Sequence, residues 1–214
     1  PTYPDLETEH QRKAPRQGPK SPAASRALAM SLNEQGHEAE AVHIISALIE
    51  NNPVTDELLN VLGLSLRRLN RLTEAKACYN SVTPTSPAGG EAQYQLGLIA
   101  LSENKNDTAK QHFQNALDLN PRLTPVHRNM SLVITYDKDH PHLRDMQQLL
   151  NEGDLQPSAE SELRFALYKA LNDTRQYDAA FEHLEQGNSL KKPTTRYSIE
   201  KDEGIFAYLK HTFA

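Results

Sequence analysis

The fold is decided by two stretches, LGLSLRRLNRLTEAKACYNSVTPTSP at residues 62–87 and LGLIALSENKNDTAKQHFQNALDLNP at residues 96–121. They align without a gap when the chain is shifted by 34 residues, and residues 28–53 align with both more loosely. The aligned columns hold Leu28, Leu62 and Leu96; Ala29, Gly63 and Gly97; Leu32, Leu66 and Ala100; Ala41, Ala75 and Ala109; Ile45, Tyr79 and Phe113; Leu48, Val82 and Ala116; and Pro53, Pro87 and Pro121. Seven columns that agree at one fixed shift indicate a repeat array.

Each unit contains two apolar stretches with helical spacing, separated by short polar breaks at residues 34–37, 70–72 and 103–106. The small residue in the first helix is expected to let the second helix approach closely. The large residue of the Ile45, Tyr79 and Phe113 column is expected to fill the remaining space. Proline lacks an N–H and disfavours helix in the preceding residue, so the proline column is expected to end each unit.

Composition excludes several other classes of protein. The apolar residues are mostly Leu and Ala, which favour helix over strand, so an all-β fold is not expected. The single Cys78 cannot form an internal disulfide, and a net charge of −5 argues against a general nucleic-acid binder. We expect a cytoplasmic chain, because no stretch reaches the roughly 18 apolar residues that a membrane span needs. The chain begins with Pro1 rather than Met, so an exported parent stays open.

The residues that one unit contributes to these columns resemble the tetratricopeptide repeat, and they are Leu62-Gly63, Leu66, Ala75, Tyr79 and Pro87. The next unit repeats the set, and the first unit has Ala29 in place of glycine. The resemblance implies an all-α fold, a right-handed α-solenoid of about five helical hairpins with a C-terminal capping helix. It also implies a scaffold for protein–protein interaction that presents a concave groove.

The remaining units are less regular. We expect a flexible tail at residues 1–21, repeats 1–4 at residues 22–155 with the fourth degenerate, and a fifth repeat with a capping helix at residues 156–214. Residues 124–135 and 140–151 are predicted to form the helices of the fourth unit. Tyr168 stands where the fifth unit should carry glycine, and the capping helix is expected over residues 198–212.

The first helix of each unit is expected to line the concave surface of such a stack. Its exposed positions would form the candidate binding groove, which we assign to Arg26, Asn33, Asn60, Leu64, Arg67, Tyr94, Leu98, Leu101 and Arg128, with Met30, Leu132 and Thr135 in the same columns. The mixture of hydrogen-bonding and apolar side chains suits a protein or peptide partner. Alternatively, the leucines only pack between adjacent helices.

One class of partner is excluded on charge. Chaperone-binding tetratricopeptide domains hold a terminal carboxylate with a Lys/Asn clamp, and the equivalent positions here are Arg26, Met30, Asn60, Glu91 and Gln95. Glu91 would repel a carboxylate, so capture of a chaperone tail is not expected.

No catalytic loop or metal site is predicted. Gly89-Gly90 is interpreted as a turn between units, since no phosphate-binding motif surrounds it. The cluster of Asp137, Asp139, His140 and His142 lacks the spacing of metal ligands, so we interpret it as a solvated turn in which Asp139 caps the next helix. Cys78 is expected to be an inert core residue. The other histidines, including His127, show no shared geometry.

The C-terminal third carries a second resemblance. The pattern Phe165-Ala166-Leu167, Lys169-Ala170, Asp173, Tyr177-Asp178, Ala180-Phe181, Gly187-Asn188 and Tyr197 resembles the last repeat of bacterial tetratricopeptide-repeat sulfotransferases. This resemblance implies that the chain is the non-catalytic N-terminal part of a sulfotransferase-like protein. No cofactor is expected in this chain, because the phosphosulfate donor would bind a missing C-terminal domain.

Lys191, Lys192, Arg196 and Tyr197 are candidate contacts to that adjoining domain, or they form a solvated connector. Two rival hypotheses stay open at this point. The chain could be a free-standing assembly adaptor, or an enzyme with its site at the irregular fourth unit.

Overall fold

The structure is a computed structural model that describes residues 22–191 and the isolated positions 202–203, 206, 208 and 210. Within residues 22–191 it contains ten α-helices, α2–α11, and no strand. The predicted all-α repeat solenoid is therefore confirmed for this part of the chain. The predicted tail at 1–21 and most of the predicted capping helix at 198–212 lie outside the described residues. The chain divides into two compact units, with the boundary between Pro121 and Arg122, and each unit is described by itself.

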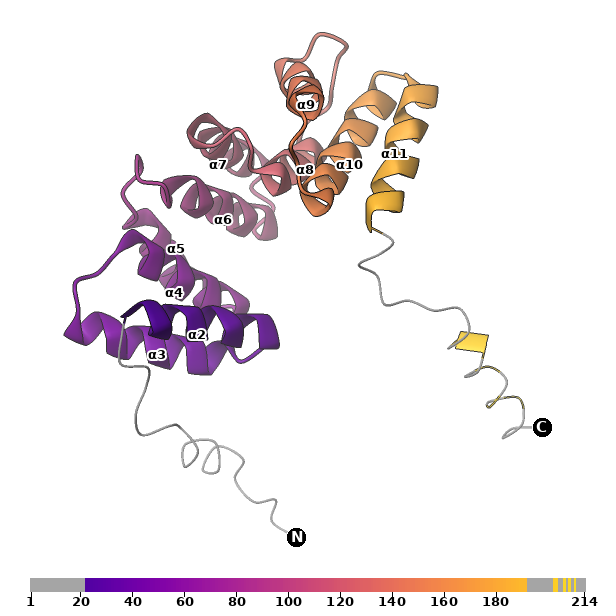
Figure 1. Cartoon of the computed structure of the whole chain (residues 1–214). Coiled ribbons are helices and arrows are strands. Elements are labelled where there is room, and N and C mark those ends of the chain that lie inside the picture. The colour runs from indigo at the N-terminus through magenta and orange to yellow at the C-terminus, as the bar shows by residue number, and fades with distance from the viewer. Residues whose placement is uncertain (1–21, 192–201, 204–205, 207, 209, 211–214) are drawn as a thin grey trace. The chain divides into compact units, whose positions relative to one another are not determined.

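The first unit consists of three helical hairpins. Its helices are α2 (Pro22–Gln35), α3 (Glu38–Asn51), α4 (Asp56–Arg68), α5 (Leu72–Asn80), α6 (Gly89–Ser102) and α7 (Asn106–Leu119). Each odd-numbered helix packs on the even-numbered helix before it, so that α2 with α3, α4 with α5 and α6 with α7 form the pairs seen in Figure 1. The inner helices α2, α4 and α6 also pack side by side. The predicted polar breaks coincide with the turns inside the hairpins.

A glycine and an aromatic ring join the two helices of the second and third hairpins. A Cβ atom added to Gly63 would lie 2.7 Å from the ring of Tyr79, and one added to Gly97 would lie 2.4 Å from the ring of Phe113. Both rings are almost fully buried. Since real Cβ atoms essentially never approach other atoms so closely, only glycine fits these two positions without a shift of the ring. This confirms the role predicted for the small-residue column.

The first hairpin joins its helices with a different pair of residues in the same columns. Ala29 of α2 and Ile45 of α3 are both fully buried, together with Ala41. The larger Ala29 is matched by the smaller Ile45, just as the glycines are matched by aromatic rings. The three hairpins thus fill the space between their helices with different residues of roughly complementary size.

The turn inside each hairpin has a repeated backbone conformation. Gly36, Asn70 and Asn104, which stand 34 residues apart, all have positive φ, between 59° and 81°. In the second hairpin the N–H of Arg71 donates to the carbonyl of Leu66 at 2.8 Å. Such a left-handed residue with a hydrogen bond back to the last helical turn is the Schellman type of helix end, which glycine and asparagine favour.

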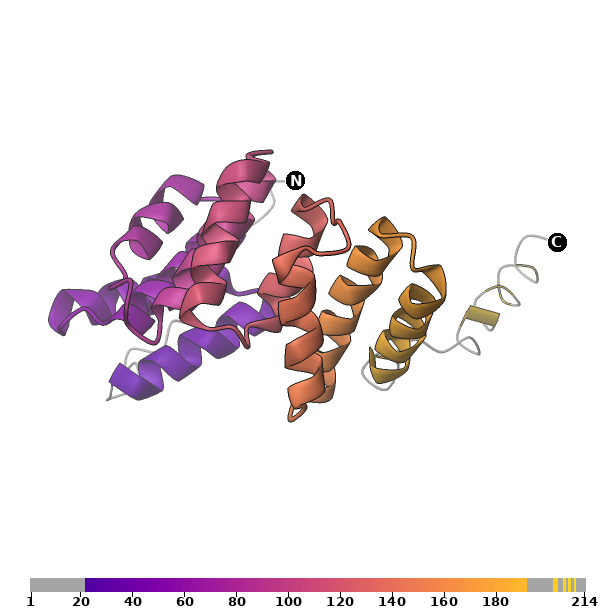
Figure 2. The ribbon, with the colours of Figure 1, turned by 90° about the horizontal axis from the view of Figure 1, so that it is seen from above.

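The second unit is built around α10. Its helices are α8 (Thr124–Val133), α9 (Pro141–Glu152), α10 (Pro157–Asp173) and α11 (Tyr177–Lys191). Helices α10 and α11 lie side by side as a hairpin in both Figure 1 and Figure 2, and α10 also packs on α8 and, less extensively, on α9. Helices α8 and α9 begin and end within two residues of their predicted bounds. They do not pack along each other as the other pairs do, as expected for a degenerate unit.

The last hairpin reverses the aromatic–glycine pair. Its glycine is Gly187 on the second helix, α11, and a Cβ atom added there would lie 3.2 Å from the ring of Phe165 on α10. Tyr168 stands in the column where the fifth unit would carry glycine. The glycine of this hairpin lies instead on the second helix, where the ring of Phe165 packs against it.

Replacing Gly97 by alanine should destabilise the first unit by about 1–3 kcal/mol, because the new methyl group overlaps the Phe113 ring. The double variant Gly97→Ala/Phe113→Leu should lose less than the sum of the two single losses, since the smaller side chain leaves room for the methyl group. Urea denaturation followed by far-UV circular dichroism measures all four free energies. Strict additivity would contradict the proposed contact.

Asn104 tests the turn. The substitution Asn104→Val should cost roughly 1–2 kcal/mol, because a β-branched residue is strained at positive φ. Asn104→Gly should leave the free energy of unfolding nearly unchanged, since glycine adopts this conformation freely. The same denaturation experiment distinguishes the variants, and equal losses for both would show that the side chain of Asn104, rather than its backbone conformation, matters.

Candidate functional site

The first unit contains a pocket over α4, between α2 and α6. Its volume is about 460 Å³. The lining residues are Arg26 and Met30 of α2; Glu57, Asn60, Val61 and Leu64 of α4; and Pro87, Ala88, Glu91 and Gln95 from α6 and the residues just before it. The pocket therefore lies across the inner helices of three consecutive repeats.

The predicted groove residues are only partly brought together. Arg26, Asn60 and Leu64 line the pocket, with Met30, and so do all five positions that correspond to the chaperone clamp. Six lining residues were not in the groove prediction, and they are Glu57, Val61, Pro87, Ala88, Glu91 and Gln95, of which the last two were named only as equivalents of the chaperone clamp. The 34-residue spacing of Glu57 and Glu91 could have indicated this side of the pocket, because it places both carboxylates at equivalent positions near the start of α4 and α6.

Polar side chains in the pocket are held by short hydrogen bonds. The amide of Asn60 donates to the carbonyl of Ala88 at 2.9 Å, which ties α4 to the start of α6. The amide of Gln95 donates to a carboxylate oxygen of Glu91 at 2.7 Å. Each bond uses one of the two N–H groups of its carboxamide. The oxygens Oδ1 of Asn60 and Oε1 of Gln95 are buried and accept no hydrogen bond within the described part of the chain.

The charges around the pocket are one cation and two anions. Hydrogen bonds from its own backbone N–H and from the hydroxyl of Thr55 lower the pKa of Glu57, and the nearby charge of Arg26 lowers it further. Arg26 and Glu57 therefore carry opposite charges near each other beside the pocket. The second carboxylate, Glu91, is exposed and hydrogen-bonded only to the neutral amide of Gln95 among the contacts the structure gives it. The pocket is therefore mainly apolar with a negative edge.

Other groove predictions are corrected by the structure. Asn33 was expected to be exposed, but it is only 2% exposed, and neither polar atom of its side chain has a hydrogen-bond partner among the residues that the structure describes. The prediction was wrong because Asn33 lies on the packed side of α2. Arg67 is half-buried, with its Nε atom enclosed, and it does not line the pocket.

Tyr94, Leu98 and Leu101 are half-buried residues of α6 that also lie outside the pocket. The ring of Tyr94 packs 6.1 Å from that of Phe113, between ring centroids. For Tyr94, packing within the hairpin describes this contact better than a groove does.

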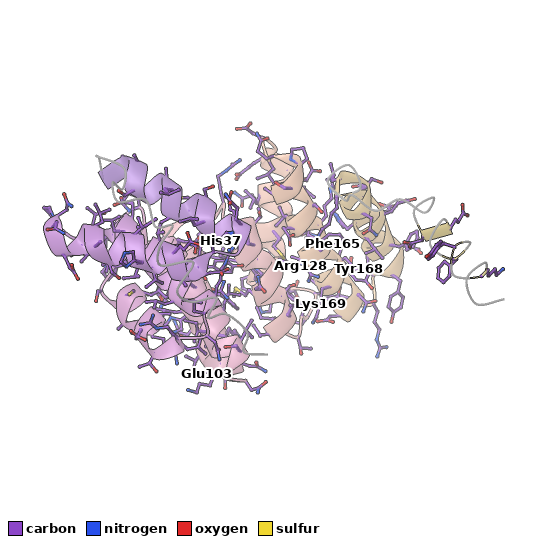
Figure 3. The ribbon with its side chains drawn as sticks, turned by 90° about the horizontal axis from the view of Figure 1, so that it is seen from below. His37, Glu103, Arg128, Phe165, Tyr168 and Lys169 are labelled. Atoms are coloured by element: carbon purple, nitrogen blue, oxygen red, sulfur yellow. The ribbon has the colours of Figure 1, made fainter. Side chains whose placement is uncertain are left out.

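Arg128 belongs to the second unit and meets Lys191 there. Their cationic groups lie 5.6 Å and 5.7 Å from the centroid of the Phe165 ring, and each has a nitrogen 4.0 Å from a carboxylate oxygen of Glu162. Figure 3 shows Arg128 and Phe165 on this unit. Two residues predicted for different roles thus share one aromatic–acidic cluster. The other candidate domain contacts, Lys192, Arg196 and Tyr197, lie outside the described residues.

The histidine turn of the fourth repeat is packed inward at His142. His142 is buried, its Nε2 lies 2.8 Å from Nδ1 of His127, and its Nδ1 lies 2.7 Å from the hydroxyl of Tyr136. The sequence analysis did not relate His127 to the turn that contains His142, and the structure brings the two together. The predicted cap was wrong, since His140 rather than Asp139 accepts the N–H of His142 at the start of α9.

Among the residues that the structure describes, no group of three or more His, Cys, Asp or Glu side chains could hold a metal ion. No helix in the same part of the chain is long and apolar enough to cross a membrane. Cys78 is half-buried against the core between α4 and α6, and burial raises the pKa of its thiol, as suits an inert residue.

Comparison with known proteins identifies the class of fold. A tetratricopeptide-repeat family model matches residues 26–90 and again residues 60–124. These matches and the structural neighbours support a tetratricopeptide-repeat protein. The resemblance to sulfotransferases is not shown by these findings.

Individual relatives are distant. Anaphase-promoting complex subunit 3 of Schizosaccharomyces pombe is 24% identical over 168 residues, which are 78% of this chain and 25% of that protein. The chain thus spans about a quarter of the length of this relative. Similar solved structures are BtubC from P. vanneervenii (TM-score 0.59, 15% identity, 89% of each chain) and the kinesin light chain repeats of Podosopora anserina (TM-score 0.56, 13% identity, 82% of this chain and 97% of that one). At these identities the structures show the fold alone.

The buried His142 makes the stability of the second unit depend on pH. Burial, with smaller contributions from His127 and His140, lowers the pKa of His142 from 6.5 to about 3. The unfolded chain therefore binds a proton between these values that the folded chain does not, and stability falls as the pH falls below 6.5. Between pH 7.5 and 5.5 the loss from this group should be about 1.4 kcal/mol.

The variant His142→Gln should lack that part of the pH dependence, whereas His43→Gln on an exposed face of α3 should keep it. Urea denaturation at the two pH values gives the change in the free energy of unfolding for the unaltered chain and for both variants. An unchanged pH dependence in His142→Gln would contradict the assignment.

Proposed function

We propose that the chain is a non-catalytic scaffold that binds a peptide segment of a partner protein in the pocket across α2, α4 and α6. One observation carries the proposal. The pocket is a mainly apolar hollow across three consecutive repeats, with the half-exposed Met30 on α2 and the exposed carboxylates of Glu57 and Glu91 beside it. Such a surface suits a peptide that packs apolar side chains into the hollow while its polar groups meet the carboxylates.

The relatives agree with this role. Tetratricopeptide repeats are interaction modules as a class, and the curated relative is by its name a subunit of a complex. The fold speaks against the rival enzyme at the fourth repeat. There, His142 is buried against His127 and Tyr136, whereas Asp137 and Asp139 are exposed, so the four residues do not converge on a substrate site. We also propose that the protein is located in the cytoplasm.

The finer proposal of a sulfotransferase-like parent rests on the sequence pattern of residues 163–197 alone. Lys191, one of its candidate domain contacts, is engaged with Glu162 and Phe165 within the second unit. The coding sequence around this chain tests it directly, because a phosphosulfate-binding strand and loop would have to follow. The alternative of a free-standing adaptor requires no such domain.

Peptide selection tests the binding role. A random peptide library displayed on phage should yield binders to the 214-residue chain whose affinity falls roughly tenfold or more in Met30→Glu, because a charge placed at the pocket rim must be desolvated on binding. Met30 is 48% exposed, so this variant should fold normally. Ala47→Glu, on an exposed face of α3, is the matched control and should bind as the unaltered chain does.

Leu64→Glu provides a second lesion at the floor of the pocket, checked for folding by circular dichroism. Selected peptides that bind Met30→Glu and Leu64→Glu as tightly as the unaltered chain would overturn the proposal. A charge reversal can also be made at Arg26, which lines the pocket. Arg67 is less suited to such a test, because its Nε atom is buried and its loss would disturb packing.

A further inference from the structure

An exposed apolar strip runs along one side of α11, the last helix that the structure describes in full. Tyr177 is 60% exposed and Phe181 is 63% exposed. The half-buried Leu184 follows them at helical spacing, whereas Ala180 and Gly187 are buried on the side that packs on α10. Apolar patches of this kind on a folded protein mark surfaces that another element or another molecule covers.

The strip lies where a further helix packs in the first unit. Phe181 follows Ala180 on α11 as Val42 follows Ala41 on α3, and each alanine is the buried fourth residue of its helix. Val42 packs against the core of the next hairpin, whose first helix α4 packs on α3. By this equivalence, the exposed side of α11 is the position at which the next helix of the array would pack.

The chain beyond α11 carries a second apolar strip. The described positions between 202 and 210 are helical, and Phe206 among them is 67% exposed. In the sequence, Ile205, Leu209 and Phe213 recur every four residues, a spacing that predicts one face of a helix together with Phe206. The chain therefore offers two apolar strips that can cover each other.

The two strips are close neighbours along the chain. Residues 192–201 join them, and ten residues in an extended conformation span up to about 33 Å. That length exceeds the roughly 10 Å between the axes of two packed helices. A short connection also holds one strip at a high effective concentration near the other, which favours contact within one molecule over contact between two.

The charges favour an antiparallel arrangement. Asp178 lies in the first turn of α11 and Lys191 in its last turn. The following segment has the opposite order of charges along the chain, because residues 200–203 hold three acidic side chains and one lysine, and Lys210 comes later. If the two helices run in opposite directions, each acidic end lies beside a basic end, and such complementarity fixes the register of a contact.

We propose that residues 198–213 pack on α11 as an antiparallel helix and cover its apolar strip with Phe206 and Leu209. The segment thus takes the place that α4 takes on α3 in the first unit. The contact lies wholly within the second unit and does not involve the pocket of the first, so it does not depend on the proposed binding role.

A single tryptophan tests the contact, because the 214-residue chain contains none. In Phe181→Trp the indole should emit at short wavelength and be weakly quenched by acrylamide, since residues 198–213 cover it. Adding Phe206→Asp or Leu209→Asp should shift the emission to longer wavelength and raise the quenching severalfold, because a carboxylate is not buried against an apolar strip. Circular dichroism checks that the helices stay folded.

Tyr208→Asp is the matched control. Tyr208 is 70% exposed and does not share the helical spacing of Phe206 and Leu209, so this variant should leave the emission of Trp at position 181 unchanged. An indole that is exposed from the start, or one that ignores Leu209→Asp, would contradict the proposal. Shielding that grows with protein concentration, together with a dimer in analytical ultracentrifugation, would assign the strip to a second copy of the chain and overturn it.

Discussion

The structure of the first unit depends on the close approach of two helices within each hairpin, made possible by pairing a small residue with a large one. Gly63 accepts the ring of Tyr79, Gly97 accepts that of Phe113, and Ala29 is matched by Ile45. Because the space is nearly constant and the interior is closely packed, either member of a pair fixes the size of the other. The last hairpin keeps the same rule with the two roles exchanged between its helices.

This packing also positions the candidate site. When the outer helix is held close, the inner helices α2, α4 and α6 pack on one another and present their free edges around α4. The pocket is lined by residues from two sides of α4 and from the adjoining sides of α2 and α6. Its polar side chains are held from within the protein, by the bonds of Asn60 to Ala88 and of Gln95 to Glu91, so this part of the wall is fixed before any ligand arrives. Such preorganisation reduces the entropy lost on binding.

The sequence predicted the repeats well, because the small and large residues that join the two helices of a hairpin recur at a fixed period in three hairpins. It predicted the site less well, since periodicity shows which positions are equivalent but not which edge of a helix faces a neighbour. Asn33 was placed in the groove although α2 buries it, and Glu57 was missed. The second unit escaped prediction where the period fails. The contact of His127 with His142 and the pairing of Phe165 with Gly187 join residues that no repeat column relates.

The central claim is that the first unit binds its ligand through the inner helices α2, α4 and α6. Amide chemical shifts of the isotopically labelled chain, recorded while a selected peptide is added, test it most directly. The account predicts that the largest changes fall on residues of α2, α4 and α6 around the pocket, with small changes on the outer helices α3 and α5. Changes centred on α3, α5 or the second unit would contradict it.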